Sequence, residues 1–155
     1  MLYQARTNTE IGFIGCEVYL NGMASLLGKM REKDVNNILL YPDDIRSLFP
    51  YFPKQSIEKV FVLYPDPWPK KKHHRRRFVT QEHLEPLSRV MKPGAELRIA
   101  TDISDYARQA LEQLNLNPNF EWKVERASDW KSPWEGWQST RYEKKALLTI
   151  GCQST

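Results

Sequence analysis

Residues 59–64 read KVFVLY and form a continuous apolar run. The run is rich in Val, Phe and Tyr, which favour strands, and its unbroken apolar character is typical of a parallel strand buried on both faces. Pro65, Asp66 and Pro67 follow it at once, so the predicted strand ends at a carboxylate held between two prolines. The same order, an apolar strand followed by an acid, recurs elsewhere in the chain.

Further strands and helices alternate on both sides of this run. We predict strands at residues 11–16, 37–41 and 96–101, and helices at residues 20–30, at residues 80–91 and through Tyr106 and Leu114. Alternation of this kind is typical of a doubly wound α/β fold with a parallel sheet. Two later segments, residues 120–127 and 144–151, are predicted to add an antiparallel edge. We therefore expect a single α/β domain over residues 1–155.

An acidic side chain stands at or just beyond the end of each of the first four predicted strands: Glu17, Asp44, Asp66 and Asp102. Because ligands bind at the carboxyl ends of parallel strands, we expect the four carboxylates to converge on one crevice. Glu17 is placed to bind a ribose diol, and Asp44 to bind an adenine amino group. Alternatively, each acid caps the helix that follows it, which is an ordinary role of Asp and Glu.

A dense basic run begins four residues after Asp66. Residues 70–77, KKKHHRRR, hold six Lys and Arg, so the net charge of +4 leaves 4 − 6 = −2 for the rest of the chain. Such a patch indicates a polyanionic partner bound at one place. A nuclear localisation signal and a solvated loop are the alternatives, but the position beside the predicted crevice favours contacts with phosphates. Trp68 offers a flat surface to a base, unless it is buried in a rigid turn.

Cysteine usage and hydropathy exclude several classes of protein. Only Cys16 and Cys152 occur, both in apolar segments and without CxxC or Cys/His spacing, so the sequence predicts buried free thiols in a reducing compartment and no metal site. No apolar run is long enough to span a bilayer, and no signal-peptide core follows Met1. We expect a cytoplasmic protein without a membrane partner.

Five segments occur in an order that resembles one family: FIGCEVYLNGMASLL, PDPWPKKKHHRRR, MKPG, ELRIATD and TRYEKKAL. The chain resembles the bacterial-type tRNA (guanine-N7-)-methyltransferases, class I enzymes with a Rossmann-like sheet that methylate a variable-loop guanine with S-adenosyl-L-methionine. The resemblance covers essentially all 155 residues. Its specific parts are PDPWPKK with the basic run and TRYE, whereas acids at strand ends are common to class I methyltransferases.

The resemblance implies a role for each matching residue. It implies cofactor contacts for Glu17, Asp44 and Asp66, with Asp66 also the catalytic residue. It implies substrate contacts for Lys70, Asp102, Thr140, Arg141, Tyr142 and Glu143. It implies RNA contacts for Lys72, His73, His74, Arg75, Arg76 and Arg77. The implied cofactor is S-adenosyl-L-methionine and the implied partner is tRNA, while a monomer and a homodimer both remain open.

The glycine-rich loop of class I methyltransferases has no counterpart in this sequence. No GxGxG occurs, and the opening MLYQARTN resembles the end of the helix that follows that loop. We therefore expect that the first strand and the loop are missing, and that the chain alone binds S-adenosyl-L-methionine weakly or not at all. A non-catalytic RNA-binding module is then the main alternative. An amino-group methyltransferase ranks below it, because its (D/N/S)PP(Y/W) signature places two prolines after the acid, whereas Asp66 lies between them.

Overall fold

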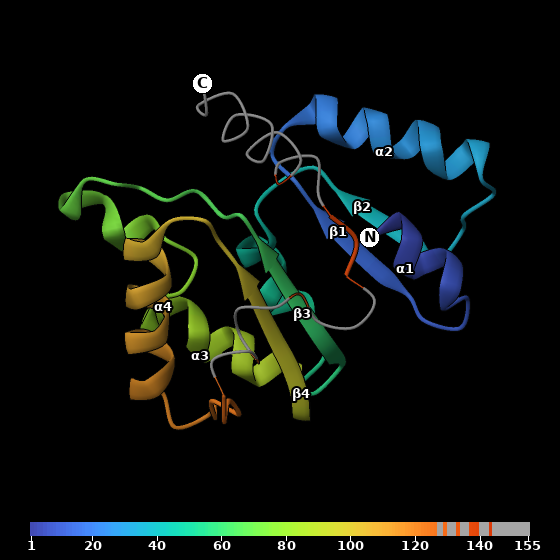
Figure 1. Cartoon of the computed structure of the whole chain (residues 1–155). Helices are drawn as coiled ribbons and strands as arrows, with labels where there is room; N and C mark the ends of the chain where they lie inside the picture. The colour runs from blue at the N-terminus through green and yellow to red at the C-terminus, as the bar shows by residue number, and fades with distance from the viewer. Residues whose placement is uncertain (127–128, 130–132, 134–136, 140–142, 144–155) are drawn as a thin grey trace. The chain divides into compact units, whose positions relative to one another are not determined.

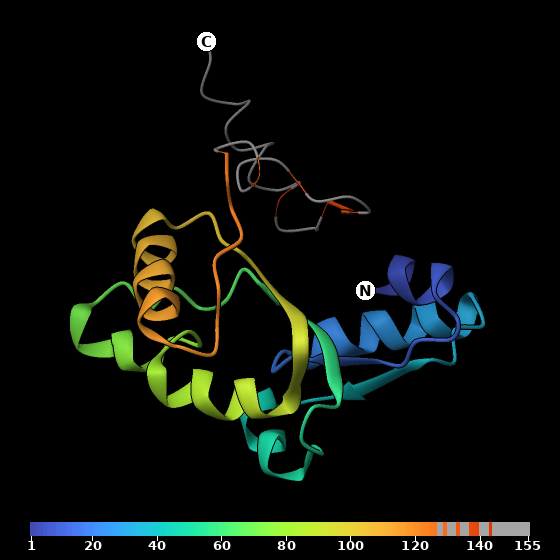
Figure 2. The ribbon, with the colours of Figure 1, turned by 90° about the horizontal axis from the view of Figure 1, so that it is seen from below.

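The computed structural model describes residues 1–126, 129, 133, 137–139 and 143 (Figures 1 and 2). They fall into two compact units, residues 1–48 with those from 133 onward, and residues 49–132. Each unit is described by itself, and the single domain over residues 1–155 stays a prediction. Within the described ranges, no helix is both long enough and apolar enough to cross a bilayer.

The first unit contains a parallel β-α-β crossover (Figure 1). Strands β1 (Phe13–Cys16) and β2 (Ile38–Tyr41) pair in parallel along their whole length. Helix α2 (Leu20–Glu32) connects them, and helix α1 (Leu2–Thr7) precedes β1. The two strands and the helix predicted from the sequence are confirmed to within two residues at each end.

Both helices of the first unit contribute to its core. Ala5 from α1, Met30 from α2 and Ile38 from β2 are buried in one apolar cluster. On the opposite face of the strand pair, Ile14 and Leu39 stand side by side in register and remain exposed. The core of this unit therefore lies on one face of its strands.

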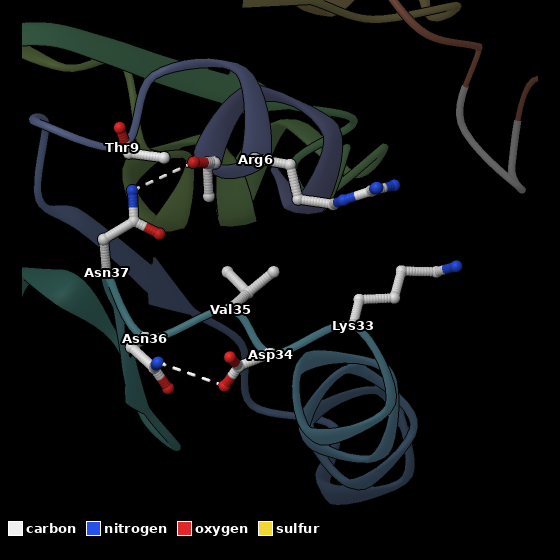
Figure 3. Close-up of a pocket in the computed structure, with 8 residues that line it drawn as sticks. Arg6, Thr9, Lys33, Asp34, Val35, Asn36 and Asn37 are labelled. Atoms are coloured by element: carbon white, nitrogen blue, oxygen red, sulfur yellow. Dashed lines mark hydrogen bonds between the residues drawn. The ribbon is translucent and has the colours of Figure 1, made fainter.

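Asn37 fixes the segment between α1 and β1. Its side-chain nitrogen donates to the carbonyl oxygens of Ala5 at 3.0 Å, Asn8 at 3.0 Å and Ile11 at 2.9 Å. Figure 3 shows this side chain reaching across from the residue before β2 to the end of α1. One amide thus ties the end of helix α1 and the loop after it to the residue before β2.

We expect Asn37→Ala to lower the free energy of unfolding by about 1–3 kcal/mol, because three carbonyl oxygens lose their shared donor. Urea unfolding followed by circular dichroism measures this as a lower midpoint at an unchanged slope. Asn36→Ala is the matched control, since that side chain donates to Asp34 on the exposed surface, and it should stay within about 0.5 kcal/mol of the wild type. Equal midpoints for the two variants would contradict the anchoring role.

The second unit contains another parallel pair with a helix between its strands. Strand β3 (Ile57–Leu63) pairs with β4 (Met91–Ala100), and helix α3 (Gln81–Val90) connects them. Helix α4 (Ser104–Leu116) follows β4. Two 3-10 helices come before these elements: η1 (Ile45–Tyr51), which begins in the first unit, precedes β3, and η2 (Lys71–Arg76) precedes α3. The predicted parallel strands and both predicted helices are confirmed, although β4 begins at Met91 rather than at residue 96.

The start of β4 is irregular. Ile57 and Lys59 are two residues apart on β3, whereas their partners Met91 and Glu96 are five residues apart on β4. Gly94 lies in this stretch with a φ of +76°, which glycine adopts without strain. The glycine therefore allows a bulge inside β4.

Strand β3 is not buried on both faces, so that expectation was wrong. Val62 is buried, but Phe61 is 39% exposed and Leu63 is 40% exposed. A strand is buried on both faces only where a layer covers each of them. Phe61 and Leu63 alternate with Val62, so they lie on the other face of the strand, and that face is partly exposed.

The predicted antiparallel edge is not present in the described residues. Residues 120–126 form no regular element, which contradicts the first of its two strands up to Arg126. Its predicted partner, residues 144–151, lies outside the described residues. A strand requires a paired neighbour, and residues 120–126 have none in the ranges that the structure describes.

Candidate functional site

The acids singled out in the sequence do follow the strands. Glu17 comes directly after β1, and Asp44 follows β2 by three residues. Asp66 follows β3 by three residues, and Asp102 follows β4 by two. Because each strand pair is parallel, each pair presents its two acids at one edge. The positions at the strand ends are confirmed, whereas the convergence of all four carboxylates stays a prediction.

The two acids of the first unit differ in what they bind. Glu17 is exposed, and one of its carboxylate oxygens accepts a hydrogen bond from the backbone nitrogen of Tyr19 at 3.0 Å. The Asp44 carboxylate accepts from the backbone nitrogen of Arg46 at 2.9 Å and from its Nε at 2.7 Å. Asp44 therefore caps η1, as the capping alternative proposes. Its contact with adenine stays a prediction, and it requires the Arg46 side chain to turn away.

A free thiol lies beside these acids. Cys16, the last residue of β1, is free, as predicted, but it is half-buried rather than fully buried. Burial, and to a smaller degree the Asp44 carboxylate, raise the pKa of the Cys16 thiol to about 11. The thiol is therefore protonated at neutral pH and is a poor nucleophile. Cys152 lies outside the described residues.

Asp66 is exposed on a loop whose backbone is restricted on both sides. Pro65 and Pro67 flank it and fix their own φ angles. Tyr64 and Trp68, one residue further out, have φ angles of +50° and +42°. Left-handed backbone is rare for residues other than glycine, and it persists where surrounding contacts enforce it. The carboxylate is therefore carried on a backbone with few free torsions.

Residues of η2 pack around Trp68. The guanidinium carbon of Arg76 lies 4.9 Å from the centre of the Trp68 ring, and the ring of His73 meets it edge-on at 5.8 Å between centroids. Cation–π and edge-to-face contacts are the favoured arrangements of such groups. Trp68 is half-buried by these contacts. Stacking of a base on its ring stays a prediction, and the base would share the ring with Arg76.

Five cations of the basic run are exposed: Lys70, Lys71, Lys72, Arg75 and Arg76. Together they form the exposed basic surface of η2 and the residue before it. Their accessibility suits the predicted contacts with phosphates, because a cation must reach the RNA backbone to displace its counterions. Those contacts themselves stay predictions.

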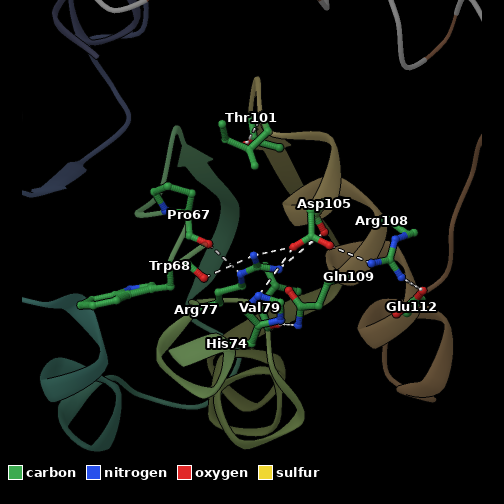
Figure 4. A network of polar contacts seen from close by, with 11 residues as sticks. Pro67, Trp68, His74, Arg77, Val79, Thr101, Asp105, Arg108, Gln109 and Glu112 are labelled. Atoms are coloured by element: carbon green, nitrogen blue, oxygen red, sulfur yellow. Dashed lines mark hydrogen bonds and ion pairs between the residues drawn. The ribbon is translucent and has the colours of Figure 1, made fainter. Parts of the chain in front are cut away.

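Arg77, the last residue of the basic run, is buried. Its side chain is 0% exposed, its Nε donates to the carbonyl oxygen of Pro67 at 2.8 Å, and its Nη2 pairs with Asp105 Oδ2 at 2.7 Å (Figure 4). A guanidinium engaged inside the protein in this way cannot also reach a phosphate. The RNA contact expected for Arg77 is therefore wrong.

Asp105, in the first turn of α4, is the residue that the sequence analysis missed. It pairs with Arg77 and with Arg108, each at 2.7 Å, and the buried Nε2 of His74 lies 3.6 Å from it. This nitrogen of His74 therefore faces inward rather than toward RNA. Hydrogen bonds from Arg77 first, and then from Arg108, lower the pKa of the Asp105 carboxyl. A lowered pKa stabilises the fold above the unfolded-state value of about 3.9, so this contribution is complete at neutral pH and is lost as the pH falls through the folded-state pKa.

Asp105 belongs to a polar stripe along α4. The Gln109 side chain donates to the carbonyl oxygen of Val79 at 2.8 Å, and the Gln113 side-chain oxygen accepts from the backbone nitrogen of Gln81 at 3.2 Å. Asp105, Gln109 and Gln113 are four residues apart, which puts them on one face of the helix. That face of α4 binds residues 77–81. The four-residue spacing of the polar side chains is the sequence signal by which this face could have been found.

The remaining predictions concern contacts with the substrate. Thr140, Arg141 and Tyr142 lie outside the described residues. Glu143 is described, and its carboxylate accepts a hydrogen bond from the Ser139 hydroxyl at 3.1 Å. The substrate contacts of these residues, and those of Lys70 and Asp102, stay predictions.

An open pocket of about 440 Å³ lies in the first unit (Figure 3). Its lining consists of Ala5, Arg6, Thr9, Lys33, Asp34, Val35, Asn36 and Asn37. Figure 3 shows Arg6 and Lys33 extending in the same direction at one end, while the Asn37 hydrogen bond closes the other. None of the predicted site residues lines this pocket.

Comparison with known proteins identifies the family. Residues 1–150 match the model of a family described as "Putative methyltransferase". The chain belongs to this methyltransferase family. Proteins of Jannaschia sp. (strain CCS1) and Ruegeria pomeroyi, each named tRNA (guanine-N(7)-)-methyltransferase, are both 58% identical to it over 147 residues, which is 95% of this chain and 62% of each relative. A protein of the same name from Hyphomonas neptunium is 45% identical over 95% of this chain and 67% of its own length.

Membership of the methyltransferase family confirms the resemblance drawn from the five sequence segments. The mixed α/β structure with parallel strand pairs is consistent with a methyltransferase fold. The chain spans about three fifths of the length of the first two relatives, 62% in each case.

Proposed function

We propose that the chain takes part in methyl transfer from S-adenosyl-L-methionine to N7 of a variable-loop guanine in tRNA. The observation that carries this proposal is the loop of Asp66, where an exposed carboxylate on a restricted backbone precedes the exposed basic surface by four residues. The name of the relatives, tRNA (guanine-N(7)-)-methyltransferase, supports the reaction and the partner.

The residues of the loop suit the chemistry of this reaction. Guanine N7 has a lone pair and no proton, so its alkylation requires placement of the reactants rather than a general base. Bound S-adenosyl-L-methionine would supply an electrophilic methyl group on its sulfonium sulfur. In the proposal, Asp66 orients the guanine and stabilises the positive charge that develops on the purine. Asp102 or Glu143 accepts hydrogen bonds from N1–H and N2–H₂ of the guanine, because a carboxylate offers only acceptors.

Glu17 fits the proposed cofactor contact better than Asp44 does. Glu17 is exposed, and within the described residues no donor is bound to its second carboxylate oxygen, so a ribose diol can approach it. The Asp44 carboxylate is engaged by the side chain of Arg46. In the proposed cofactor set of Glu17, Asp44 and Asp66, the contact of Asp44 therefore depends on a movement of Arg46.

The proposal extends to the arrangement of the whole chain. In the proposal, the β1–β2 pair and the β3–β4 pair belong to one Rossmann-like sheet and one domain, so that the four acids lie at the same edge of the sheet. A cytoplasmic location accords with a tRNA substrate. A monomer and a homodimer both remain compatible with the proposal.

A methyl-transfer assay with tritiated S-adenosyl-L-methionine and unmodified tRNA transcripts tests the proposal. Because weak binding of S-adenosyl-L-methionine is expected for this chain alone, the assay uses a high concentration of the labelled cofactor, and we expect label in 7-methylguanosine after nuclease digestion. A transcript with 7-deazaguanosine is the matched control, because it keeps the phosphates and the Watson–Crick edge but lacks the acceptor nitrogen. It should bind and accept no label, and equal labelling of both transcripts would contradict attack by N7. Binding of both transcripts without any transfer would favour the RNA-binding module instead.

A further inference from the structure

We infer that Arg77, held by Asp105, is a positioning residue that fixes the loop carrying Asp66. The inference deepens the proposed function and rests on it, since Asp66 is the residue proposed to act on the guanine.

The guanidinium of Arg77 is engaged at all three of its nitrogens (Figure 4). Its Nε donates to Pro67 at 2.8 Å, its Nη2 to Asp105 Oδ2 at 2.7 Å and to the Trp68 carbonyl at 3.5 Å, and its Nη1 to the Asp105 carbonyl at 3.5 Å. Tyr106 packs beside the group, with its ring centre 5.2 Å from the guanidinium carbon. Arg77 therefore joins the loop to the first turn of α4.

These contacts act on the backbone next to Asp66. Pro67 and Trp68 are the two residues that follow it, and Arg77 binds the carbonyl oxygens of both. Trp68 has a φ of +42°, a conformation that persists in a residue other than glycine only where its surroundings enforce it. Arg77 supplies that constraint, because it holds the peptide groups on both sides of the Trp68 Cα.

Asp105 keeps Arg77 in this place. A guanidinium that is 0% exposed requires a counter-charge, and the Asp105 carboxylate provides it at 2.7 Å. Arg108 pairs with the other carboxylate oxygen at the same distance, but it is 65% exposed and also pairs with Glu112 along α4. Of the two guanidinium groups on Asp105, only that of Arg77 is seen to reach the loop within the described residues.

Arg77 and the exposed cations should therefore differ in kinetic effect. Arg75 and Arg76 are accessible, so their loss weakens the attraction for RNA and raises KM. Arg77 is buried, so its loss displaces the loop and lowers kcat.

Arg77→Lys in the full chain tests the inference. Lysine keeps the charge and can pair with Asp105, but its single ammonium cannot also hold the two carbonyl oxygens of the loop. We expect kcat to fall about 100-fold, with KM for tRNA within about twofold of the wild type. We also expect the indole N–H signal of Trp68 in the NMR spectrum, identified by its loss in Trp68→Phe, to shift or broaden.

Two further variants sharpen the test, each checked for folding by circular dichroism. Arg108→Gln removes the other guanidinium from Asp105 and should leave the Trp68 signal and kcat as in the wild type. Asp105→Asn keeps the size of the side chain but removes its charge, and it should change both readouts in the direction of Arg77→Lys.

The readouts also separate the inference from the proposed function. If Arg77→Lys and Asp105→Asn match Arg108→Gln in both readouts, the positioning role is overturned. If the wild-type chain transfers no methyl group, the proposed function fails, and the Trp68 signal alone then decides whether Arg77 fixes the loop.

Discussion

Asp66→Ala is expected to lower kcat for methyl transfer by about 100- to 1,000-fold, which is the loss typical when a single charge-stabilising group is removed from an active site. The dissociation constant for tRNA should change little, because Asp66 is an exposed acid that does not itself attract phosphates. Single-turnover methyl transfer and filter binding measure the two quantities separately.

Asp66→Asn and Glu85→Ala complete this experiment. Asp66→Asn keeps the shape of the side chain and removes the charge, so a loss as large as that of Asp66→Ala assigns the effect to the charge. Glu85→Ala removes an exposed acid from α3 in the same unit and should behave as the wild type. A large loss of tRNA binding by Asp66→Ala with normal turnover would refute the catalytic role.

Neutralising the exposed basic surface should remove most of the salt dependence of RNA binding. If its five cations each meet one phosphate, log K falls against log salt with a slope of about −3.5 to −4.5. A fourfold rise in salt then weakens wild-type binding by roughly 100- to 500-fold. Arg77 is left out of this count because it is buried. Filter binding across a salt series measures the slope for the wild type and for the variant with Gln at all five positions.

A charge-matched variant distinguishes the basic surface from net charge. It replaces by Gln five exposed cations outside the run: Lys29, Arg31, Lys33, Lys54 and Lys123. Its slope of log K against log salt should stay close to that of the wild type, because these five residues are not among the predicted RNA contacts. Equal slopes for the two five-residue variants would show that RNA is not bound by the basic run.

The order of strands and helices could be predicted because it depends on local apolar patterns. α2 repeats its apolar residues at helical spacing, and β3 is a short apolar run, so each could be located from a few neighbouring residues. The early start of β4 could not be predicted, because the bulge around Gly94 depends on the pairing of β4 with β3. The exposure of Phe61 likewise depends on which layers cover the strand, and a strand's own sequence does not specify these.

The candidate site also has features that could be predicted from neighbouring residues and features that could not. The restricted backbone at Asp66 follows from the adjacent prolines and could be predicted. Arg77 could not be distinguished from Arg75 by its neighbours, because its burial depends on Asp105, 28 residues away in the sequence. Asp44 is an intermediate case, since its capping partner Arg46 is only two residues away and the pattern was open to both interpretations.

The bond between Arg77 and Pro67, ten residues apart, closes a ring in the chain. The exposed cations lie between Pro67 and Arg77 in the chain, whereas Asp66 comes immediately before Pro67. Substitutions of these exposed cations leave the hydrogen bond between Arg77 and Pro67 intact. If the basic run binds RNA as proposed, substitutions of its exposed cations can therefore change the affinity for RNA without moving the Asp66 carboxylate.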